Sequence, residues 1–570
     1  MAYNALNESL QLHRLNVLTL FFAVFLALVI GKIFQRQIIE YTNFAALARE
    51  QHVVNENTPA PRGKILVYDP QLNSYYPLAV NVALYSLNVV PTQVKQPELV
   101  ANKLMPYLFD ITEAELLDIL ESNKVYAPPL KRRVEVKEKE EIQNLNLDGV
   151  YFRSEEYRYY PEDSLASQVL GFVNRDQLGQ YGIEGYFDQE LSGKAGLEQV
   201  EKSSLGSHIT VGNRKIVNPE DGADIVLTID RAIQYYVEKK LKEAVEKHEA
   251  TGGDVIIMEP TTGRIIAMAS YPDFNPNYYN QYSLENFANP NVSLAYEPGS
   301  VFKIFTIAAG IDTGLISPST TYVDTGEVKI DDDVVRNSDL AAYGVQTMTQ
   351  VLEKSLNTGA TFVVQKLGRQ LFYKYLKDLG FDASTNVGLD GEIAASVRSF
   401  REWADIDLAS MSFGQAVAVT PIQLIAAVGA IANQGKLVKP HIVDKIIYPG
   451  GAASIDTQVV RVAMKPQTAQ LVGAMMVSVV ERGHGQLAGV PGYRIAGKTG
   501  TAQIASPGGY EKNVSIGTFV GFAPVDNPRF VMLTRIDRPK DAKFAEVSAA
   551  PLFSDIAKFL FDYWQIPPDK

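Results

Sequence analysis

The sequence contains no cysteine in its 570 residues. This absence excludes thiol catalysis, disulfide bonds and cysteine-based zinc sites. Only six histidines occur, and because they show no metal-ligand spacing we expect neither a metal site nor a cofactor. A basic excess is also missing, since the formal net charge is −12, and nothing indicates nucleic-acid binding. No phosphate loop of the form G-x-x-x-x-G-K-[ST] is present.

Long apolar runs are scarce, with one exception near the N-terminus. Residues 15–34 form an almost uninterrupted apolar segment, close to the roughly 20 residues that cross a bilayer. We predict a transmembrane anchor there, after a tail of residues 1–14, with residues 35–50 continuing as an amphipathic helix. A cleaved signal peptide is the alternative, but no clear small-x-small cleavage site follows. More positive charges follow the span than precede it, so charge alone does not fix its orientation.

The remaining sequence divides into two predicted domains that differ in composition and in the regularity of their apolar patterns. Residues 35–215 are polar, irregular and strand-rich, and the charges over 131–141 (KRRVEVKEKEE) alternate as on a solvated face. Residues 213–222 (NRKIVNPEDG) are predicted as a linker, because proline and glycine interrupt regular structure. The second domain, residues 216–570, has clear helix and strand patterns.

These patterns predict an α/β arrangement in the second domain. A helix capped by Asp230 carries an apolar stripe, and another begins at Thr420 with proline in its first turn. The predicted strands lie at 225–229, 255–258, 264–269, 519–523 and 530–536, and a final helix covers 550–564.

Three short motifs follow one another in this domain. The first is Ser300-Val301-Phe302-Lys303, the only Ser-x-x-Lys in the chain. A serine hydroxyl needs a nearby base to act as a nucleophile, and residues three apart on a helix share one face. The preceding proline and glycine place Ser300 near a helix N-terminus, where backbone N–H groups favour an oxyanion. Burial in this apolar helix would lower the pKa of Lys303 and make it a proton acceptor.

The second motif is Ser355-Leu356-Asn357. Ser-x-Asn also occurs at 86–88 and 384–386, so the tripeptide gains meaning only from its order among the three motifs. A second hydroxyl can relay a proton between two lysines, and an asparagine can hold a substrate amide.

The third motif, Lys498-Thr499-Gly500-Thr501, lies on a predicted strand whose glycines admit close backbone approach. An extended peptide can add to the exposed edge of such a strand. Lys498 and the hydroxyls of Thr499 and Thr501 would then face a carboxylate.

With these motifs the sequence resembles a class B penicillin-binding protein, a monofunctional D,D-transpeptidase. Further similar stretches are PRGKI at 61–65, the 158–196 segment beginning RYYPEDS, YEPGSVFK, SFGQ, VTPIQL, GKTGTAQ and FVGFAP. YEPGS and SFGQ favour the division-associated branch over the elongation branch. The implied fold class is α+β: one transmembrane helix, an elongated strand-rich pedestal (dimerisation-like) domain, and a serine β-lactamase-like transpeptidase domain with an antiparallel sheet flanked by helices.

The resemblance also implies the roles of the site residues. Ser300 would attack the penultimate D-Ala carbonyl of a stem peptide, with Lys303 as general base and release of D-Ala. Ser355 and Lys498 would deliver protons, and Asn357 would contact the donor peptide.

Two backbone N–H groups, those of Ser300 and Thr501, would form the oxyanion hole. Thr499 and Thr501 would hold the terminal carboxylate, with Gly500 between them in the substrate-binding strand. β-Lactams would mimic D-Ala-D-Ala and trap Ser300.

The sequence departs from the family pattern at two places in the pedestal. Asp163 stands where glycine is usual, and the stretch between Gly63 and Asp69 is longer than usual. No glycosyltransferase-like module precedes the pedestal, so a SEDS-type membrane glycosyltransferase and other divisome or elongasome membrane proteins are the implied partners. The large domain would then face the wall from the bacterial inner membrane, with a cytoplasmic N-terminus.

Three other functions are compatible with parts of this pattern. A D,D-carboxypeptidase or a β-lactamase would share the fold but would deacylate with water. A β-lactam sensor would place several membrane spans before the domain, whereas one apolar span is seen here. A catalytically silent scaffold is the third, and the complete set of motif residues disfavours it.

Overall fold

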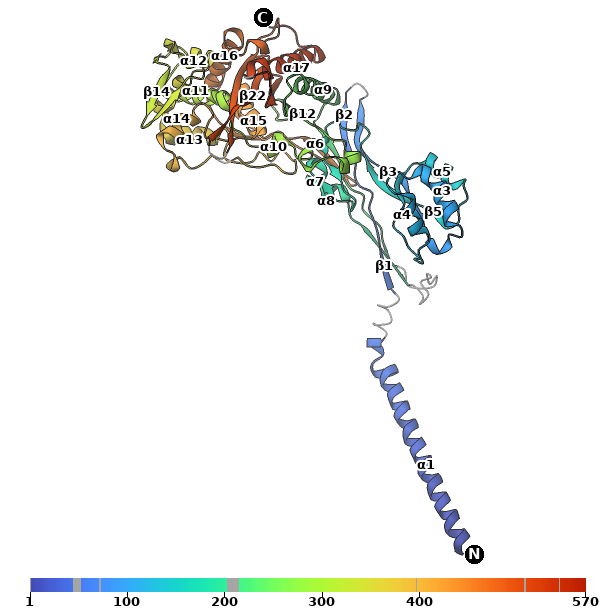
Figure 1. Ribbon diagram of the computed structural model, residues 1–570. Helices are drawn as coiled ribbons and strands as arrows, with labels where there is room; N and C mark the ends of the chain where they lie inside the picture. The colour runs from blue at the N-terminus through green and yellow to red at the C-terminus, as the bar shows by residue number, and fades with distance from the viewer. Residues whose placement is uncertain are drawn as a thin grey trace. The chain divides into compact units, whose positions relative to one another are not determined.

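The computed structural model describes residues 2–44, 53–70, 73–201, 215–395, 397–506, 509–542 and 544–570. The chain forms two compact units. The first contains Met1–Pro61 and Gly193–Asp221, and the second contains Arg62–Ser192 and Gly222–Lys570. The ribbon is shown in Figure 1.

The first unit contains the apolar N-terminal segment. Helix α1 (Ala2–Phe34) continues into a π-helical turn, η1 (Gln35–Ile39). Among the described helices, the stretch Leu12–Ile39 alone is long and apolar enough to cross a membrane. The predicted amphipathic helix over 35–50 is π-helical over Gln35–Ile39 and α-helical over 41–44, and residues 45–50 lie outside the described residues.

A three-stranded antiparallel sheet completes this unit, in the order β1 (Val53–Thr58), β8 (Gly196–Glu201) and β9 (Lys215–Val217). The prediction of an irregular linker at 213–222 was wrong for residues 215–217, which form a strand. Lys215–Val217 pairs with β8, because strand pairing satisfies backbone groups that the local proline and glycine signals do not count.

The second unit contains a seven-stranded sheet. Its strands come from both predicted domains, residues 35–215 and 216–570. Its order is β19-β18-β10-β2-β3-β4, and β5 also pairs with β3. The strands are β2 (Ile65–Asp69), β3 (Ser74–Val89), β4 (Lys131–Val134), β5 (Val150–Tyr159), β10 (Asp224–Leu227), β18 (Val443–Tyr448) and β19 (Gly451–Ser454). The parallel pairing of β10 with β2 joins segments about 160 residues apart, as Ile225 opposite Ile65 shows.

Several short helices lie between β3 and β10 in the sequence. Their bounds are α3 (Pro97–Leu104), α4 (Glu113–Leu120), α5 (Val136–Gln143), α6 (Ser167–Leu170), α7 (Gly182–Tyr186) and α8 (Asp188–Ser192). A small core that includes Leu87, Leu104 and Leu116 packs α3 and α4 against β3. The charge block 131–141 forms β4 and most of α5, where Lys131 pairs with Glu138 at 2.5 Å.

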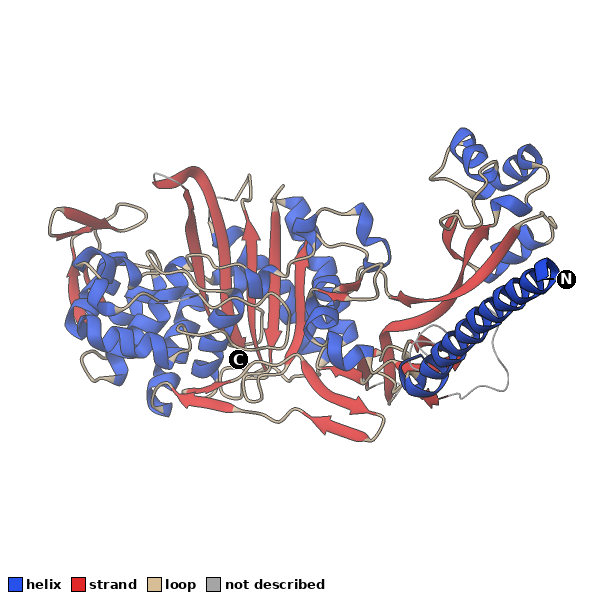
Figure 2. Ribbon diagram, turned by 90° about the horizontal axis from the view of Figure 1, so that it is seen from below, coloured by secondary structure: helices blue, strands red, loops and turns tan. Residues whose placement is uncertain are grey.

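The sheet that carries the third motif has five antiparallel strands in the order β12-β11-β23-β22-β21. Their bounds are β11 (Gly252–Met258), β12 (Ile265–Tyr271), β21 (Ala496–Ser506), β22 (Gly509–Ala523) and β23 (Phe530–Asp537). The strands predicted at 255–258 and 264–269 are confirmed, and they pair with each other as an antiparallel hairpin. Helices lie on both faces of this sheet (Figure 2), and the predicted α+β class is confirmed.

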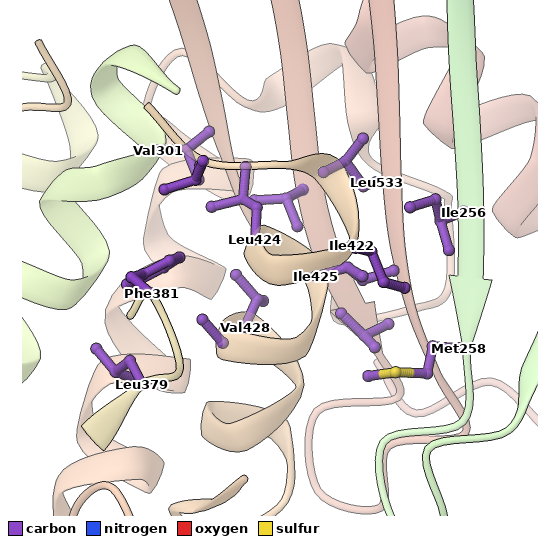
Figure 3. Packing of buried hydrophobic residues seen from close by; sticks show 14 of the residues in the cluster. Ile256, Met258, Val301, Leu379, Phe381, Ile422, Leu424, Ile425, Val428 and Leu533 are labelled. Atoms are coloured by element: carbon purple, nitrogen blue, oxygen red, sulfur yellow. The ribbon is translucent and has the colours of Figure 1, made fainter. Parts of the chain in front are cut away.

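Alternation along β11 separates two cores. Val255 and Ile257 join the apolar stripe of α9 (Arg231–Lys247) and α17 (Ala549–Tyr563), whereas Ile256 and Met258 face the opposite side. There they pack with α15 (Pro421–Ala432), as Figure 3 shows for Ile422 and Ile425.

The helix caps follow the predicted chemistry. Asp230 accepts hydrogen bonds from the N–H groups of Ala232 and Ile233 at 3.0 Å each. Thr420 and Gln423 form a capping box at the start of α15. The remaining helices around the site are α11 (Lys303–Asp312), α12 (Met348–Glu353), α13 (Asn357–Asp378), α14 (Asp405–Met411) and α16 (Pro466–Arg482).

Candidate active site

The first motif lies in a tight turn rather than in the first turn of an α-helix. Residues Gly299–Phe302 form a 3₁₀ turn, η6, and the α-helix α11 begins at Lys303. Gly299 has a φ of +57°, and a Cβ there would lie 2.8 Å from the carbonyl oxygen of Thr501. Glycine therefore lets this turn approach the third motif closely, and leaves Ser300 half-buried at the surface of the site.

Lys303 connects the first two motifs. Its side chain is fully buried, and Nζ lies 3.0 Å from Ser300 Oγ. The same Nζ donates to the carbonyl oxygen of Ser355 at 2.5 Å and lies 3.2 Å from Ser355 Oγ. The lysine is thus in hydrogen-bond contact with both serine hydroxyls.

Ser355 occupies the turn between α12 and α13. Its φ is +57°, a left-handed conformation that costs a non-glycine residue about 1–2 kcal/mol. Such strain persists where the surrounding structure holds it, and it is found frequently at functional sites. Here the turn points the hydroxyl between Lys303 and Lys498.

Lys498 supplies the third contact. Its fully buried Nζ lies 3.0 Å from Ser355 Oγ, and it also donates to Thr499 O at 3.0 Å. Thr499 Oγ1 is 3.4 Å away. Ser300, Lys303, Ser355 and Lys498 therefore form one continuous hydrogen-bonded chain, although they come from three segments far apart in the sequence.

Burial controls the charge of the two lysines. Removal from water lowers the pKa of Lys498 to about 7, although Glu546 acts in the opposite direction. Burial also lowers the pKa of Lys303 well below its usual value, and repulsion from Lys498 lowers it further. Both effects favour the neutral form of Lys303, which is the form that can accept a proton.

The residues predicted to face a substrate lie on the edge strand β21. Gly500 packs against η6, since a Cβ would lie 2.6 Å from the carbonyl oxygen of Pro298. Thr501 Oγ1 accepts a hydrogen bond from Ala545 N at 3.2 Å, which leaves its own proton for an external acceptor. Thr499 is mostly buried beside Lys498.

Asn357 begins α13, so the second motif occupies the short turn between two helices. Its Nδ2 donates to the carbonyl oxygen of Arg336 at 2.8 Å. The side-chain oxygen has no recorded partner among the described residues, and it is the atom available to a ligand.

Two further features support the turn that carries Ser300, and the sequence patterns assigned them no role. Glu297 accepts hydrogen bonds from Ala416 N at 2.8 Å and from the Tyr510 hydroxyl at 3.1 Å. Gly414, within the SFGQ stretch, contacts the turn so closely that a Cβ would lie 2.1 Å from Gly299 O. The glycine in that stretch is the one sequence signal that could have indicated this contact.

The pedestal signatures meet in a buried ionic cluster. Glu184, whose side chain is inaccessible, pairs with Arg62 at 2.7 Å and with Arg158 at 2.6 Å. Arg62 also pairs with Asp188 at 2.7 Å. This cluster fixes the chain at the PRGKI stretch against β5 and α7.

The departure at Asp163 has a structural explanation. Its φ is +53°, in the region where glycine is usual and aspartate is tolerated. The carboxylate accepts a hydrogen bond from Asn275 Nδ2 at 3.0 Å. No group of three or more metal-binding side chains occurs within the ranges that the structure describes.

This fold and this chain of serines and lysines define a serine acyltransferase, and comparison with known proteins gives the family. Residues 253–558 match the penicillin-binding protein transpeptidase domain, and residues 57–227 match the penicillin-binding protein dimerisation domain. Because the first match covers more than half of the chain, the protein belongs to the penicillin-binding protein transpeptidases.

Individual relatives agree with this assignment. Stage V sporulation protein D of Bacillus subtilis is 33% identical over 84% of this chain and 76% of its own length. The probable peptidoglycan D,D-transpeptidase PenA of Neisseria meningitidis is 30% identical over 98% of this chain and 94% of its own. The crystal structure of penicillin-binding protein 3 from Mycobacterium tuberculosis, complexed with aztreonam, matches with a TM-score of 0.70 at 29% identity, covering 90% of this chain and 98% of that one.

Proposed function

We propose that this protein is a peptidoglycan D,D-transpeptidase that cross-links stem peptides through an acyl-enzyme on Ser300. One observation carries the proposal: the Ser355 hydroxyl lies between Lys303 and Lys498 while Lys303 Nζ lies 3.0 Å from Ser300 Oγ. Such an arrangement provides a nucleophile, a base and a proton relay within hydrogen-bond reach.

Acylation begins when Ser300 Oγ attacks the penultimate D-Ala carbonyl carbon and its proton passes to neutral Lys303. The backbone N–H groups of Ser300 and Thr501 hold the resulting oxyanion, an interaction whose loss typically costs about 10²–10³ in rate. A proton then reaches the departing D-Ala amine through Ser355 and Lys498, and the acyl-enzyme remains.

The donor peptide lies along the open edge of β21, as an added strand. Its terminal carboxylate accepts hydrogen bonds from the hydroxyls of Thr499 and Thr501, and Gly500 leaves room for close approach. The Asn357 amide contacts the peptide backbone. An amine of a second stem peptide then attacks the acyl-enzyme, forms the cross-link and restores the Ser300 hydroxyl.

The apolar helix and the family together support a location. Residues 1–14 are cytoplasmic, 15–34 span the bacterial inner membrane, 35–215 form the pedestal and 216–570 the transpeptidase domain outside the cytoplasm. The reaction needs a polymerised glycan, which a SEDS-type glycosyltransferase supplies. YEPGS and SFGQ favour service in septal division with other divisome proteins.

β-Lactams inhibit the enzyme by acylating the same hydroxyl. This part of the proposal is supported by the aztreonam complex of the mycobacterial relative. In this enzyme a β-lactam would mimic D-Ala-D-Ala and remain on Ser300.

Intact-protein mass spectrometry of the full-length chain in detergent tests the proposal. After incubation with penicillin, the wild type should carry one penicillin and Ser300→Ala should carry none. An unmodified wild type with intact antibiotic would contradict the proposal and favour a silent scaffold. Hydrolysed antibiotic would favour the β-lactamase alternative. A matched control is Ser293→Ala, a nearby serine whose hydroxyl bonds to the backbone of its own helix.

A further inference from the structure

Helix α13 starts at the second motif without a cap of its own. The residue at the N-cap position is Leu356, whose side chain cannot accept a hydrogen bond. The first N–H groups of a helix nevertheless need acceptors, especially where they are removed from water. Serine, threonine, aspartate or asparagine usually fills this position.

The missing acceptor comes from Asn337, about 20 residues earlier in the chain. Its Oδ1 accepts hydrogen bonds from Asn357 N at 3.0 Å and from Thr358 N at 3.4 Å. Asn337 is 2% exposed and directly follows strand β15 (Asp333–Arg336). A side chain that is distant in the sequence therefore caps α13, the helix that follows the turn at Ser355.

A second buried residue fixes the orientation of that amide. Asn337 Nδ2 lies 3.1 Å from both carboxylate oxygens of Asp324 and also donates to Ala341 O at 3.1 Å. A flipped amide would place its N–H₂ against the two helix N–H groups and its oxygen against a carboxylate. The surrounding donors and acceptors thus admit one orientation.

Asp324 also contacts the helix directly. Its Oδ1 accepts from the Thr358 hydroxyl at 2.7 Å, and the Tyr322 hydroxyl lies 3.0 Å from that oxygen of Thr358. The Asp324 carboxylate accepts two more hydrogen bonds, from the backbone N–H groups of Gly326 and Tyr343. Asp324 is 2% exposed, so the whole cluster is withdrawn from water.

Asn337 and Asp324 join the start of α13 to two small hairpins. Strand β13 (Thr321–Asp324) pairs with β16 (Gly344–Thr347), and β14 (Glu327–Ile330) pairs with β15. The β14–β15 hairpin lies in the yellow part of the chain in Figure 1, and its strand β15 contacts α13 and α14. The contact is reciprocal, because Asn357 Nδ2 donates back to Arg336 O at 2.8 Å.

We propose that Asn337, oriented by Asp324, is a positioning residue that holds the start of α13 and thereby the left-handed turn at Ser355. Ser355 lies two residues before the capped N–H of Asn357, so a change in the helix start moves its hydroxyl relative to Lys303 and Lys498. Among the described residues, the Asn337 side chain has no hydrogen bond to Ser300, Lys303, Ser355 or Lys498, so it would act through the helix. The inference rests on the function proposed above and extends it to the residues that set its geometry.

The test measures penicillin acylation of full-length variants in detergent, well below their melting temperatures. Asn337→Ala should lower the acylation rate constant at saturating penicillin by about 10–100-fold, since small misplacement of a catalytic group has such effects. The matched control is Asp230→Ala, which removes a cap that also accepts two N–H bonds, on α9. It should lower the melting temperature similarly and change the acylation rate less than about twofold.

Asn337→Asp provides a second measurement that a general loss of stability would not reproduce. The aspartate keeps the acceptor but loses the donor toward Asp324, so two carboxylates face each other and the pKa of one rises. Among the described residues, Asp324 is the one charged side chain that hydrogen-bonds to Asn337, and the hydroxyls of Tyr322 and Tyr343 are the titratable groups that interact with Asp324 in turn. The acylation rate relative to wild type should therefore recover as the pH falls from about 8 to about 5.

The outcomes separate the two proposals. A wild type that is not acylated would overturn the proposed function and this inference together. An acylated wild type with an unchanged rate in Asn337→Ala, or an equal loss in Asp230→Ala, would overturn the inference alone. If Asn337→Ala does not fold, Asn337→Asp decides: recovery at low pH supports the positioning role, and a pH-independent rate ratio overturns it.

Discussion

The buried Lys498 should make the enzyme less stable near neutral pH than it would be with an apolar side chain there. The pKa of this lysine falls from 10.5 to about 7 on folding. Between these two values the unfolded chain binds more protons than the folded one, so the free energy of unfolding rises with pH. At pH about 7 the shift costs about 4 kcal/mol, and at pH about 10 it costs about 1 kcal/mol.

Hydrogen bonds offset part of this cost. The Nζ atom has contacts with Ser355 Oγ, Thr499 O and Thr499 Oγ1, which together contribute about 3 kcal/mol at about 1 kcal/mol each. Lys498→Met removes both the cost of burying the amine and its hydrogen bonds, and the methionine side chain has a similar volume. The variant should be about 1 kcal/mol more stable than wild type at pH about 7, and about 2 kcal/mol less stable at pH about 10.

Thermal unfolding followed by tryptophan fluorescence measures this difference. Both tryptophans, Trp403 and Trp564, lie in the region that contains the site, and Trp403 is 2% exposed. Lys239→Met, at an exposed position of α9, controls for the change in net charge. The stability difference between Lys498→Met and wild type should reverse sign across this pH range. A difference that does not vary with pH would refute the reasoning, whatever its size.

Two further predictions concern close packing and buried charge. Gly414→Ala should lower the penicillin acylation rate at least about tenfold, because its Cβ would lie 2.1 Å from a backbone oxygen of the nucleophile turn. Gly391→Ala has nearly the same φ, +80° against +82°, with nothing within 4 Å, and equal effects would contradict the packing argument. Arg62→Met should destabilise the protein by about 3–5 kcal/mol in thermal unfolding followed by circular dichroism, because it leaves Glu184 buried with one partner fewer. Lys194→Met, which breaks an exposed ion pair, should cost less than about 1 kcal/mol, and a similar loss in both variants would refute the distinction.

Elements with a strong local pattern could be predicted from the sequence. Helix α9 follows from Asp230 and its stripe of apolar residues, and the β11–β12 hairpin follows from two apolar runs around a turn. Strand β9 was missed, because its pairing with β8 is decided by chain segments that a local reading does not compare. The same reason hides the parallel pairing of β10 with β2.

The candidate site was predictable as a set of residues but not as a geometry. Ser300 and Lys303 share a local motif, so their proximity follows from helical spacing. The position of Ser355 Oγ between two lysines depends on a left-handed residue that no sequence rule assigns to serine. Asn337 had no signal at all, since an asparagine after a strand is ordinary and its partner helix begins 20 residues later.

These features have a common physical consequence. Two fully buried lysines and a left-handed serine are each unfavourable where they stand, and local interactions do not compensate for all of that cost. The large apolar cores on both faces of the five-stranded sheet provide the stability that allows it. Substitutions that relieve the strain should therefore stabilise the fold near neutral pH and reduce acylation together, which is the trade-off expected where a site depends on its own unfavourable groups. A stabilising Lys498→Met variant that retained full acylation would show that the buried lysine is not part of the machinery.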